Sequence, residues 1–154
     1  MVVPRRMWES SVVIGYLSGS PFAQPTCDLI IAQAERGELE IVVCTMAEAE
    51  VAFLRGLSPM DSESKIKEFF SRRYIVRCGV DVGIMPFVRQ LLRTHSGLKP
   101  PDAIHIAICL QWHIPVLETF DNGMLALDRK EGSPPLIIRK PLYQGSQPFP
   151  GFKV

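Results

Sequence analysis

The stretch at residues 39–50 reads LEIVVCTMAEAE and decides the fold class. Its first six residues form a short and mostly apolar run, which is typical of a buried strand. Thr45 and Glu48 then have the Thr-x-x-Glu spacing of a capping box, which predicts a helix from Thr45 through Leu54 to Gly56. A strand that passes directly into a helix is a building unit of parallel α/β sheets.

The same alternation of strands and helices extends in both directions along the chain. The other predicted strands are short and apolar: one ending near Glu9, and residues 74–78, 115–120 and 136–139. The other predicted helices follow capping or turn residues, and they begin at Ser10, Pro25, Asp61, Asp81, Ala103 and Asp121. This order predicts an α/β fold, a three-layer α/β/α sandwich around a central, mostly parallel sheet.

Length and composition indicate one domain. A chain of 154 residues suits a single core, so we expect one domain at residues 1–144 and a Pro- and Gly-containing tail at residues 145–154. Hydrophobic residues make up 47% of the chain and charged residues 21%, which excludes an intrinsically disordered protein. The net charge of +1 excludes a protein that coats polyanions, so any nucleic-acid contact must be a local patch.

Apolar runs and cysteines point to a cytoplasmic protein with reduced thiols. No apolar run approaches the roughly 20 residues that a membrane span needs. The N-terminus has Arg5 and Arg6 but no apolar leader, so the cytoplasm is the expected location. The cysteines at 27, 44, 78 and 109 have no CxxC spacing, which predicts packed thiols and no structural metal.

Four acidic residues stand at predicted strand ends or in the first turns of the helices that follow: Glu9, Glu50, Asp102 and Asp121. Ligands of open α/β sheets bind at this edge. Four anions on a half-buried edge repel one another, so a cluster of this kind predicts a divalent cation. Oxygen ligands without imidazole or thiolate favour Mg²⁺ or Mn²⁺ over zinc. Such ions promote in-line displacement at phosphate, which predicts phosphodiester hydrolysis.

These residues lie in segments that resemble a PIN domain over residues 7–127. The segments are ESSVVIGYL at 9–17, Thr45 with Glu50 five residues on, PDAIHIA at 101–107 and VLETFD at 116–121. The segment around Asp102 and the Thr-x-Asp pattern that ends at Asp121 are the most specific. The first acidic position of the family is usually aspartate, and here it is Glu9, which is one methylene longer.

The resemblance implies a Mg²⁺- or Mn²⁺-dependent endoribonuclease that hydrolyses RNA. Small members of the family include VapC-type toxins, so it also implies a toxin of a toxin–antitoxin pair, frequently a homodimer, silenced by an antitoxin protein. It places the metal-binding and catalytic carboxylates at Glu9, Glu50, Asp102 and Asp121. It also implies supporting hydroxyl groups at Ser11, Thr45 and Thr119. Asn122, next to Asp121, is a further supporting candidate from its position alone, as a rival helix cap or a second polar contact.

Basic residues near the acids suggest where RNA would bind. Arg89 and Arg93 are four residues apart on one helix face, and with Lys99 they could bind phosphates beside Asp102. A solvated helix face is the alternative explanation for this pair. Further basic candidates are Arg55, Arg72 and Arg73. His105, on an apolar helix, is interpreted as a core histidine with one hydrogen bond.

The same residues also allow other interpretations. Asp102 and Asp121 could act only as helix caps, and Glu9 could be a solvated strand-end carboxylate. Glu50 has no such simple explanation, because the pattern puts it inside an apolar helix face. The alternative function is a catalytically silent PIN-like scaffold that binds RNA or a protein partner. A phosphatase or receiver-like domain is less favoured, because no strand ends in a nucleophilic aspartate with a positioned lysine.

Overall fold

A parallel five-stranded sheet forms the centre of the fold in the computed structural model, which describes residues 2–145. The strands are β1 (Arg5–Trp8), β2 (Glu40–Cys44), β3 (Ile75–Cys78), β4 (Val116–Glu118) and β5 (Ile137–Arg139). Their order is β3-β2-β1-β4-β5, and each neighbouring pair is parallel. All five carboxyl ends therefore lie at one edge of the sheet, as predicted.

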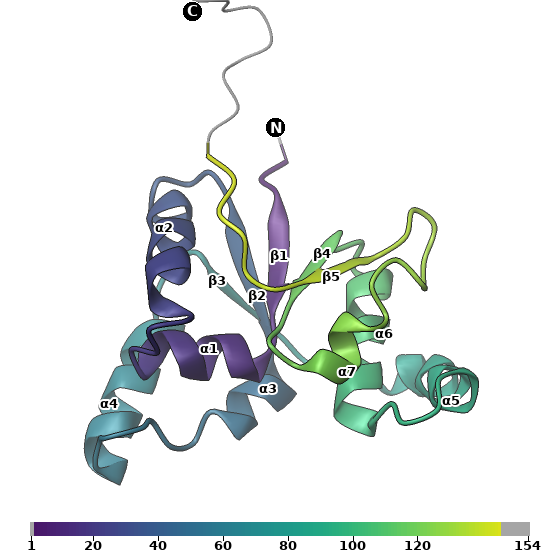
Figure 1. The fold of residues 1–154 in the computed structure, drawn as a ribbon, viewed down its shortest axis with the longest axis horizontal. Coiled ribbons are helices and arrows are strands. Elements are labelled where there is room, and N and C mark those ends of the chain that lie inside the picture. The colour runs from purple at the N-terminus through teal and green to yellow at the C-terminus, as the bar shows by residue number, and fades with distance from the viewer. Residues whose placement is uncertain (1, 146–154) are drawn as a thin grey trace, which may run out of the picture.

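Helices cover both faces of the sheet (Figure 1). The helices that pack with one face are α1 (Ser10–Leu17), α2 (Gln24–Glu35) and α4 (Pro59–Phe70). Those that pack with the other face are α5 (Met85–Thr94), α6 (Pro100–Gln111) and α7 (Asn122–Leu125), with the 3₁₀ helix η1 (Val82–Ile84). The short helix α3 (Thr45–Glu50) follows β2 directly. The arrangement confirms the predicted α/β/α sandwich.

Two apolar cores result from the alternation of side chains along the strands. Trp8 and Ile41 pack with α1 and α2, whereas Met7 and Val42 pack with α5 and α6. Neighbouring strand residues point to opposite faces, so strands with apolar residues at successive positions are buried on both sides. The apolar helix α6 is covered along most of its length, as its composition predicts.

The predicted capping box in the segment after β2 is not formed. Cys44 is the N-cap of α3 and Thr45 is its first residue, while the Glu48 carboxylate pairs with Arg77 at 2.6 Å. The helix also ends at Glu50 and not at Gly56. It stops early because Val51 and the nearby Leu54 leave the helix to become buried in the core shared with α4.

Prolines shift two helix starts away from the predicted residues. The sequence predicts a helix that begins at Ala103, but Pro100 and Pro101 already lie in the first turn of α6, so Asp102 is inside the helix and Lys99 is the N-cap. A helix tolerates proline there because the first N–H groups have no intrahelical partner. Likewise α4 begins at Pro59, and its N-cap is Ser58 and not the predicted Asp61.

The helix cap at Asp121 and the buried thiols agree with the sequence predictions. Asp121 caps α7 as predicted and accepts a hydrogen bond from the Met124 amide at 2.9 Å. The four cysteines are buried and free. Within residues 2–145 no helix is long and apolar enough to cross a membrane. The predicted division at residue 145 stays a prediction, because residues 146–154 lie outside the described part of the chain.

Candidate active site

One cavity at the carboxyl edge of the sheet brings together all four predicted acids. It has a volume of about 410 Å³. The residues that line it come from four separate segments: Glu9, Ser11, Glu50, Lys99, Pro101, Asp102, Phe120 and Asp121. Glu9, Glu50 and Asp121 come from the chain that follows β1, β2 and β4 at this edge. Lys99, Pro101 and Asp102 come from the start of α6, which follows α5 and not a strand.

Glu9 is the most firmly held of the acids. It is the N-cap of α1 and only 8% exposed. Its carboxylate accepts hydrogen bonds from the Ser10 hydroxyl at 2.6 Å, the Ser11 amide at 3.0 Å and hydroxyl, and the Thr119 hydroxyl at 3.0 Å. Burial alone would raise the pKa of Glu9, but these hydrogen bonds outweigh burial and lower it. Glu9 is therefore held as an oriented anion.

Two hydroxyl groups connect Glu9 to the last acidic position. Thr119 is fully buried, and its Oγ1 donates to Glu9 while it accepts from the Asp121 amide at 3.0 Å. The Ser11 hydroxyl also donates to Glu9 and accepts from the Phe120 amide at 3.0 Å. The ends of β1 and β4 are thus bound to each other through side chains that the sequence predicts as supporting residues.

Asp102 and Glu50 are the acids of the cluster whose pKa values are raised. Burial, then the charge of Asp121, then that of Glu9 raise the pKa of Asp102. Burial and the charge of Glu9 raise the pKa of Glu50. Neither carboxylate accepts a hydrogen bond from another described residue, so both keep free lone pairs beside the cavity.

The surroundings of Glu50 differ from the prediction. The sequence pattern puts it inside an apolar helix face, whereas it is the exposed last residue of α3. The reason is the early end of α3: the next residue, Val51, turns into the core and leaves Glu50 at the rim of the cavity.

The four carboxylates suit a hard divalent cation in their chemistry, although their side chains are not close enough together to coordinate one jointly. Carboxylate oxygens are the ligands that Mg²⁺ and Mn²⁺ prefer, and the raised pKa values of Asp102 and Glu50 show a negative potential that a cation would relieve. In the part of the chain that is described, no three His, Cys, Asp or Glu side chains form a metal-binding group. Shared coordination would therefore need rotation of these side chains.

A second cavity continues from the acidic one. Its volume is about 610 Å³, and it shares Lys99, Asp102 and Asp121 with the first cavity. It extends along the segment between α5 and α6 to Lys130. Lys99 therefore lines both cavities, whereas Arg89 and Arg93, the other predicted RNA-binding residues, line neither.

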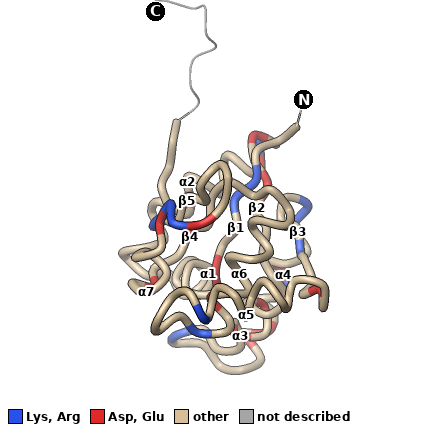
Figure 2. The backbone as a smooth tube through the Cα atoms, turned by 90° about the vertical axis from the view of Figure 1, so that its right-hand side faces the viewer, with Lys and Arg blue, Asp and Glu red and all other residues tan. Residues whose placement is uncertain are grey.

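The other predicted supporting and basic residues lie outside both cavities. Arg89 and Arg93 are exposed on α5, where Figure 2 shows basic positions. Thr45 and Asn122 are exposed first residues of α3 and α7, and neither lines either of these two cavities. Of the further basic candidates, Arg55 is exposed in the segment after α3.

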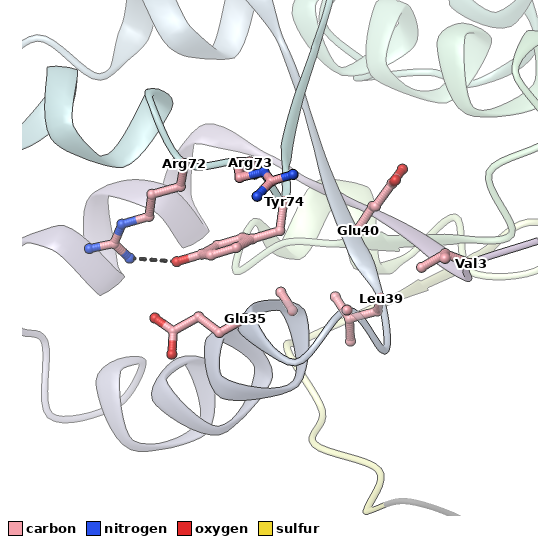
Figure 3. A pocket seen from close by; sticks show the side chains of 9 residues that line it. Val3, Glu35, Leu39, Glu40, Arg72, Arg73 and Tyr74 are labelled. Atoms are coloured by element: carbon pink, nitrogen blue, oxygen red, sulfur yellow. Dashed lines mark hydrogen bonds between the residues drawn. The ribbon is translucent and has the colours of Figure 1, made fainter.

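Arg72 and Arg73 lie at the opposite edge of the sheet from the acids. They line a pocket of about 490 Å³ beside the first residues of β2 and the residue before β3 (Figure 3). Arg72 is engaged there with the Tyr74 hydroxyl at 2.9 Å and with Glu68 at 3.0 Å. This position separates both arginines from the acidic cavity.

His105 is a core residue, as the sequence suggests. It is 1% exposed, and its Nδ1 lies 2.7 Å from the carbonyl oxygen of Pro101. Because a carbonyl can only accept, Nδ1 carries the proton. Nε2 has no partner among the described residues.

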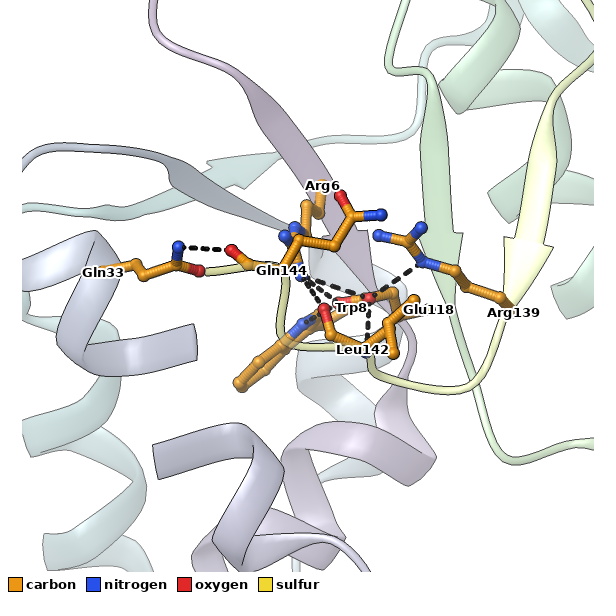
Figure 4. Close-up of polar contacts among 7 residues, drawn as sticks. All are labelled: Arg6, Trp8, Gln33, Glu118, Arg139, Leu142 and Gln144. Atoms are coloured by element: carbon orange, nitrogen blue, oxygen red, sulfur yellow. Dashed lines mark hydrogen bonds and ion pairs between the residues drawn. The ribbon is translucent and has the colours of Figure 1, made fainter. Parts of the chain in front are cut away.

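Glu118 is a buried carboxylate that the sequence reasoning missed. It is fully buried and bonded to Arg6, Trp8, Arg139 and Leu142 (Figure 4). A usable signal was present, because Glu118 is an acid at the end of an apolar strand run, directly before Thr119. Its side chain projects to the opposite face from that of Thr119, since neighbouring strand residues alternate.

Comparisons with known proteins agree with this fold. The PIN domain family model matches residues 7–130. Among solved structures, a similar one is the Mycobacterium tuberculosis toxin VapC20, which cleaves the sarcin-ricin loop: the TM-score is 0.63 and the identity 11%, over 79% of this chain and 93% of that chain. The comparison with curated proteins gives no match. The family match covers most of the chain, and so this chain belongs to the PIN domain family.

Proposed function

We propose that this protein is a Mg²⁺- or Mn²⁺-dependent endoribonuclease of the VapC-like kind, which hydrolyses RNA phosphodiester bonds. The observation that carries the proposal is the meeting of Glu9, Glu50, Asp102 and Asp121 around one cavity. The similarity to a toxin that cleaves the sarcin-ricin loop supports RNA as the substrate class.

In this proposal the four carboxylates hold the ion and the hydroxyl groups orient them. When bound, Mg²⁺ or Mn²⁺ supplies positive charge to the attacking water and to the phosphate oxygens. Ser11 and Thr119 keep Glu9 ionised and in place through their hydrogen bonds. Glu50 is exposed and has no described hydrogen-bond donor, so its carboxylate is free to accept a proton from water.

Lys99 is the residue that we propose contacts the RNA backbone at the site. It lines both cavities, and the second cavity leads from the acids to Lys130. Two ammonium groups along one hollow can bind successive phosphates, which orients a strand without reading its sequence. Arg89 and Arg93 on the exposed face of α5 would contact a longer RNA outside the cavities.

The toxin assignment extends to partners and location. We propose that the protein works in the cytoplasm as a homodimer and that a cognate antitoxin protein silences it. Light scattering after size exclusion tests the dimer, because a monomer has a mass of 17.3 kDa. Co-purification of a partner that blocks cleavage tests the antitoxin.

The proposal is tested by incubating the purified protein with structured and unstructured RNAs, with and without Mn²⁺. Wild type is expected to cleave with Mn²⁺ and not with a chelator present. Glu9→Gln should abolish cleavage, because it removes the anion that the hydroxyls orient. Glu9→Asp keeps the charge and should keep measurable cleavage. Equal cleavage by wild type and Glu9→Gln would overturn the proposal.

The second candidate is a silent PIN-like scaffold that binds RNA or a protein through the same groove. Two observations favour it: Glu9 replaces the usual aspartate, and no three potential ligands form a metal-binding group within residues 2–145. A scaffold would bind RNA without cleaving it, and Mn²⁺ would leave its melting temperature unchanged. A metal-dependent melting shift together with cleavage excludes this candidate.

A further inference from the structure

We propose that Glu118 is a positioning residue. Through it, the C-terminal segment at residues 141–145 holds the ends of β1 and β4, and with them Glu9 and Asp121, in the arrangement that cleavage needs. This inference rests on the proposed nuclease function and adds to it a structural role for a segment outside the matched domain. The PIN match ends at residue 130, whereas the segment that contacts Glu118 follows β5.

Glu118 is bound on both carboxylate oxygens in a site without solvent access. Oε1 accepts from Trp8 Nε1 at 3.0 Å. Oε2 accepts from the Leu142 amide at 3.0 Å, from Arg6 Nη1 at 3.3 Å and from Arg139 Nε at 3.4 Å. A buried carboxylate is tolerated only when paired and hydrogen-bonded in this way, so the four donors and Glu118 form one unit.

This unit includes backbone from the C-terminal segment and reaches α2 (Figure 4). Arg6 Nη1 also donates to the Leu142 carbonyl at 2.8 Å, so one guanidinium contacts both the carboxylate and the segment. Two residues later, the Gln144 carbonyl accepts from Gln33 Nε2 at 2.8 Å. The segment is therefore fastened at two points, one on the sheet and one on α2.

The unit is directly coupled to the acidic cavity through backbone hydrogen bonds. The carbonyl of Glu118 accepts from the Glu9 amide at 3.1 Å, and the Thr119 amide donates to the Arg139 carbonyl at 2.9 Å. The Thr119 hydroxyl contacts both Glu9 and the Asp121 amide. A displacement of residues 118–119 therefore moves the groups that orient two of the four acids.

The test replaces Glu118 by glutamine, which keeps the shape but faces N–H donors with an NH₂ group. Glu40→Gln is the matched control, because it removes another Arg–Glu pair, to Arg5 at 2.8 Å, at the amino end of the sheet. For Glu118→Gln we expect kcat to fall by about 10- to 100-fold, as for other residues that orient ligands, with little change in KM. Faster hydrogen exchange at the Phe120 and Asp121 amides should accompany it. The control should change neither quantity.

A second variant keeps the test decisive if Glu118→Gln does not fold. Leu142→Pro removes the amide that donates to Glu118, and Tyr143→Pro is its control, because no described residue accepts from that amide. Leu142→Pro should lower kcat and speed exchange at the same two amides. Folded variants with wild-type kcat and exchange overturn the inference. If wild type cleaves no RNA, the proposed function fails, and the exchange of the two amides still decides the role of Glu118.

Discussion

Thr119→Val tests whether the hydroxyl network sets the charge state of Glu9. Valine has nearly the same shape, so the change removes two hydrogen bonds without opening a cavity. One is to the Glu9 carboxylate and the other is from the Asp121 amide, both at 3.0 Å. A bond to a charged acceptor is worth about 1.5–3 kcal/mol and a neutral one about 1 kcal/mol, so we expect a loss of about 2.5–4 kcal/mol in the free energy of unfolding at neutral pH.

The loss of unfolding free energy in Thr119→Val should depend on pH. The pKa of Glu9 is lowered in the folded state from its ordinary value of 4.5. Ionised Glu9 thus contributes stability that is complete above 4.5 and is lost as the pH falls through the folded pKa. Thr119→Val removes one of the bonds that lower this pKa. The difference between wild type and variant should therefore shrink as the pH drops below 4.5, leaving the part due to the Asp121 amide.

The free energy of unfolding of wild type and Thr119→Val is measured by urea unfolding, followed by tryptophan fluorescence. The measurements run from pH 7 down to the lowest pH at which both proteins stay folded. Thr94→Val is a matched control, because it removes an exposed hydroxyl bond to the Gln90 carbonyl, and it should cost less than about 0.5 kcal/mol. A Thr119→Val loss that is equally small, or that does not change with pH, would refute the assigned network.

Three further predictions concern the cluster and its ligands. Asp102→Asn should raise the melting temperature of the metal-free protein at pH 7, because burial and the charges of Asp121 and Glu9 raise the pKa of Asp102, so stability falls as the pH rises through that pKa. In calorimetry this gain should vanish below pH 3.8, the ordinary value, and a variant that melts lower at pH 7 would contradict it. Lys99→Ala should raise KM and lower the salt slope of RNA binding by about 1, measured by fluorescence anisotropy. Arg89→Ala should change KM and the salt slope less than Lys99→Ala does. An equal effect of the two variants would argue against RNA binding along the two cavities. Mn²⁺ should raise the melting temperature of wild type in a fluorescence melting assay, and a matching rise in Asp102→Asn would place the ion elsewhere.

The sequence predicts the sheet and the segments that carry the site because both follow from local patterns. Short apolar runs mark β2 and β4, and an acid or hydroxyl just after each run marks the carboxyl edge. Ser11 and Thr119 are predicted by the resemblance to the PIN family and not by the local pattern. The contact of Thr119 with Glu9 also requires β1 and β4 to be neighbours in the sheet, which the structure shows and the sequence does not predict.

The errors arise where tertiary contacts override local signals. The Thr45 capping box fails because Glu48 pairs with Arg77 from the neighbouring strand, 29 residues away. Glu50 is exposed because burial of Val51 ends α3. In each case a contact with a distant residue decides the outcome, and spacing along the chain does not report it.

Glu118 shows the same limit for the site. Its bonds reach back 112 residues to Arg6 and forward 24 residues to Leu142. Sequence position alone marks it as another strand-end acid. Only the sheet register, which places Trp8 beside Glu118, shows that it faces the core and not the cavity.

The central claim is that acids from four distant parts of the chain form one binding site for a divalent cation. The most direct measurement is a calorimetric titration of Mn²⁺ into wild type and into Asp102→Asn and Glu9→Gln variants at neutral pH. Mn²⁺ should bind to wild type, and binding should be strongly weakened in both variants. Absence of binding to wild type, or equal binding to all three proteins, would contradict this claim.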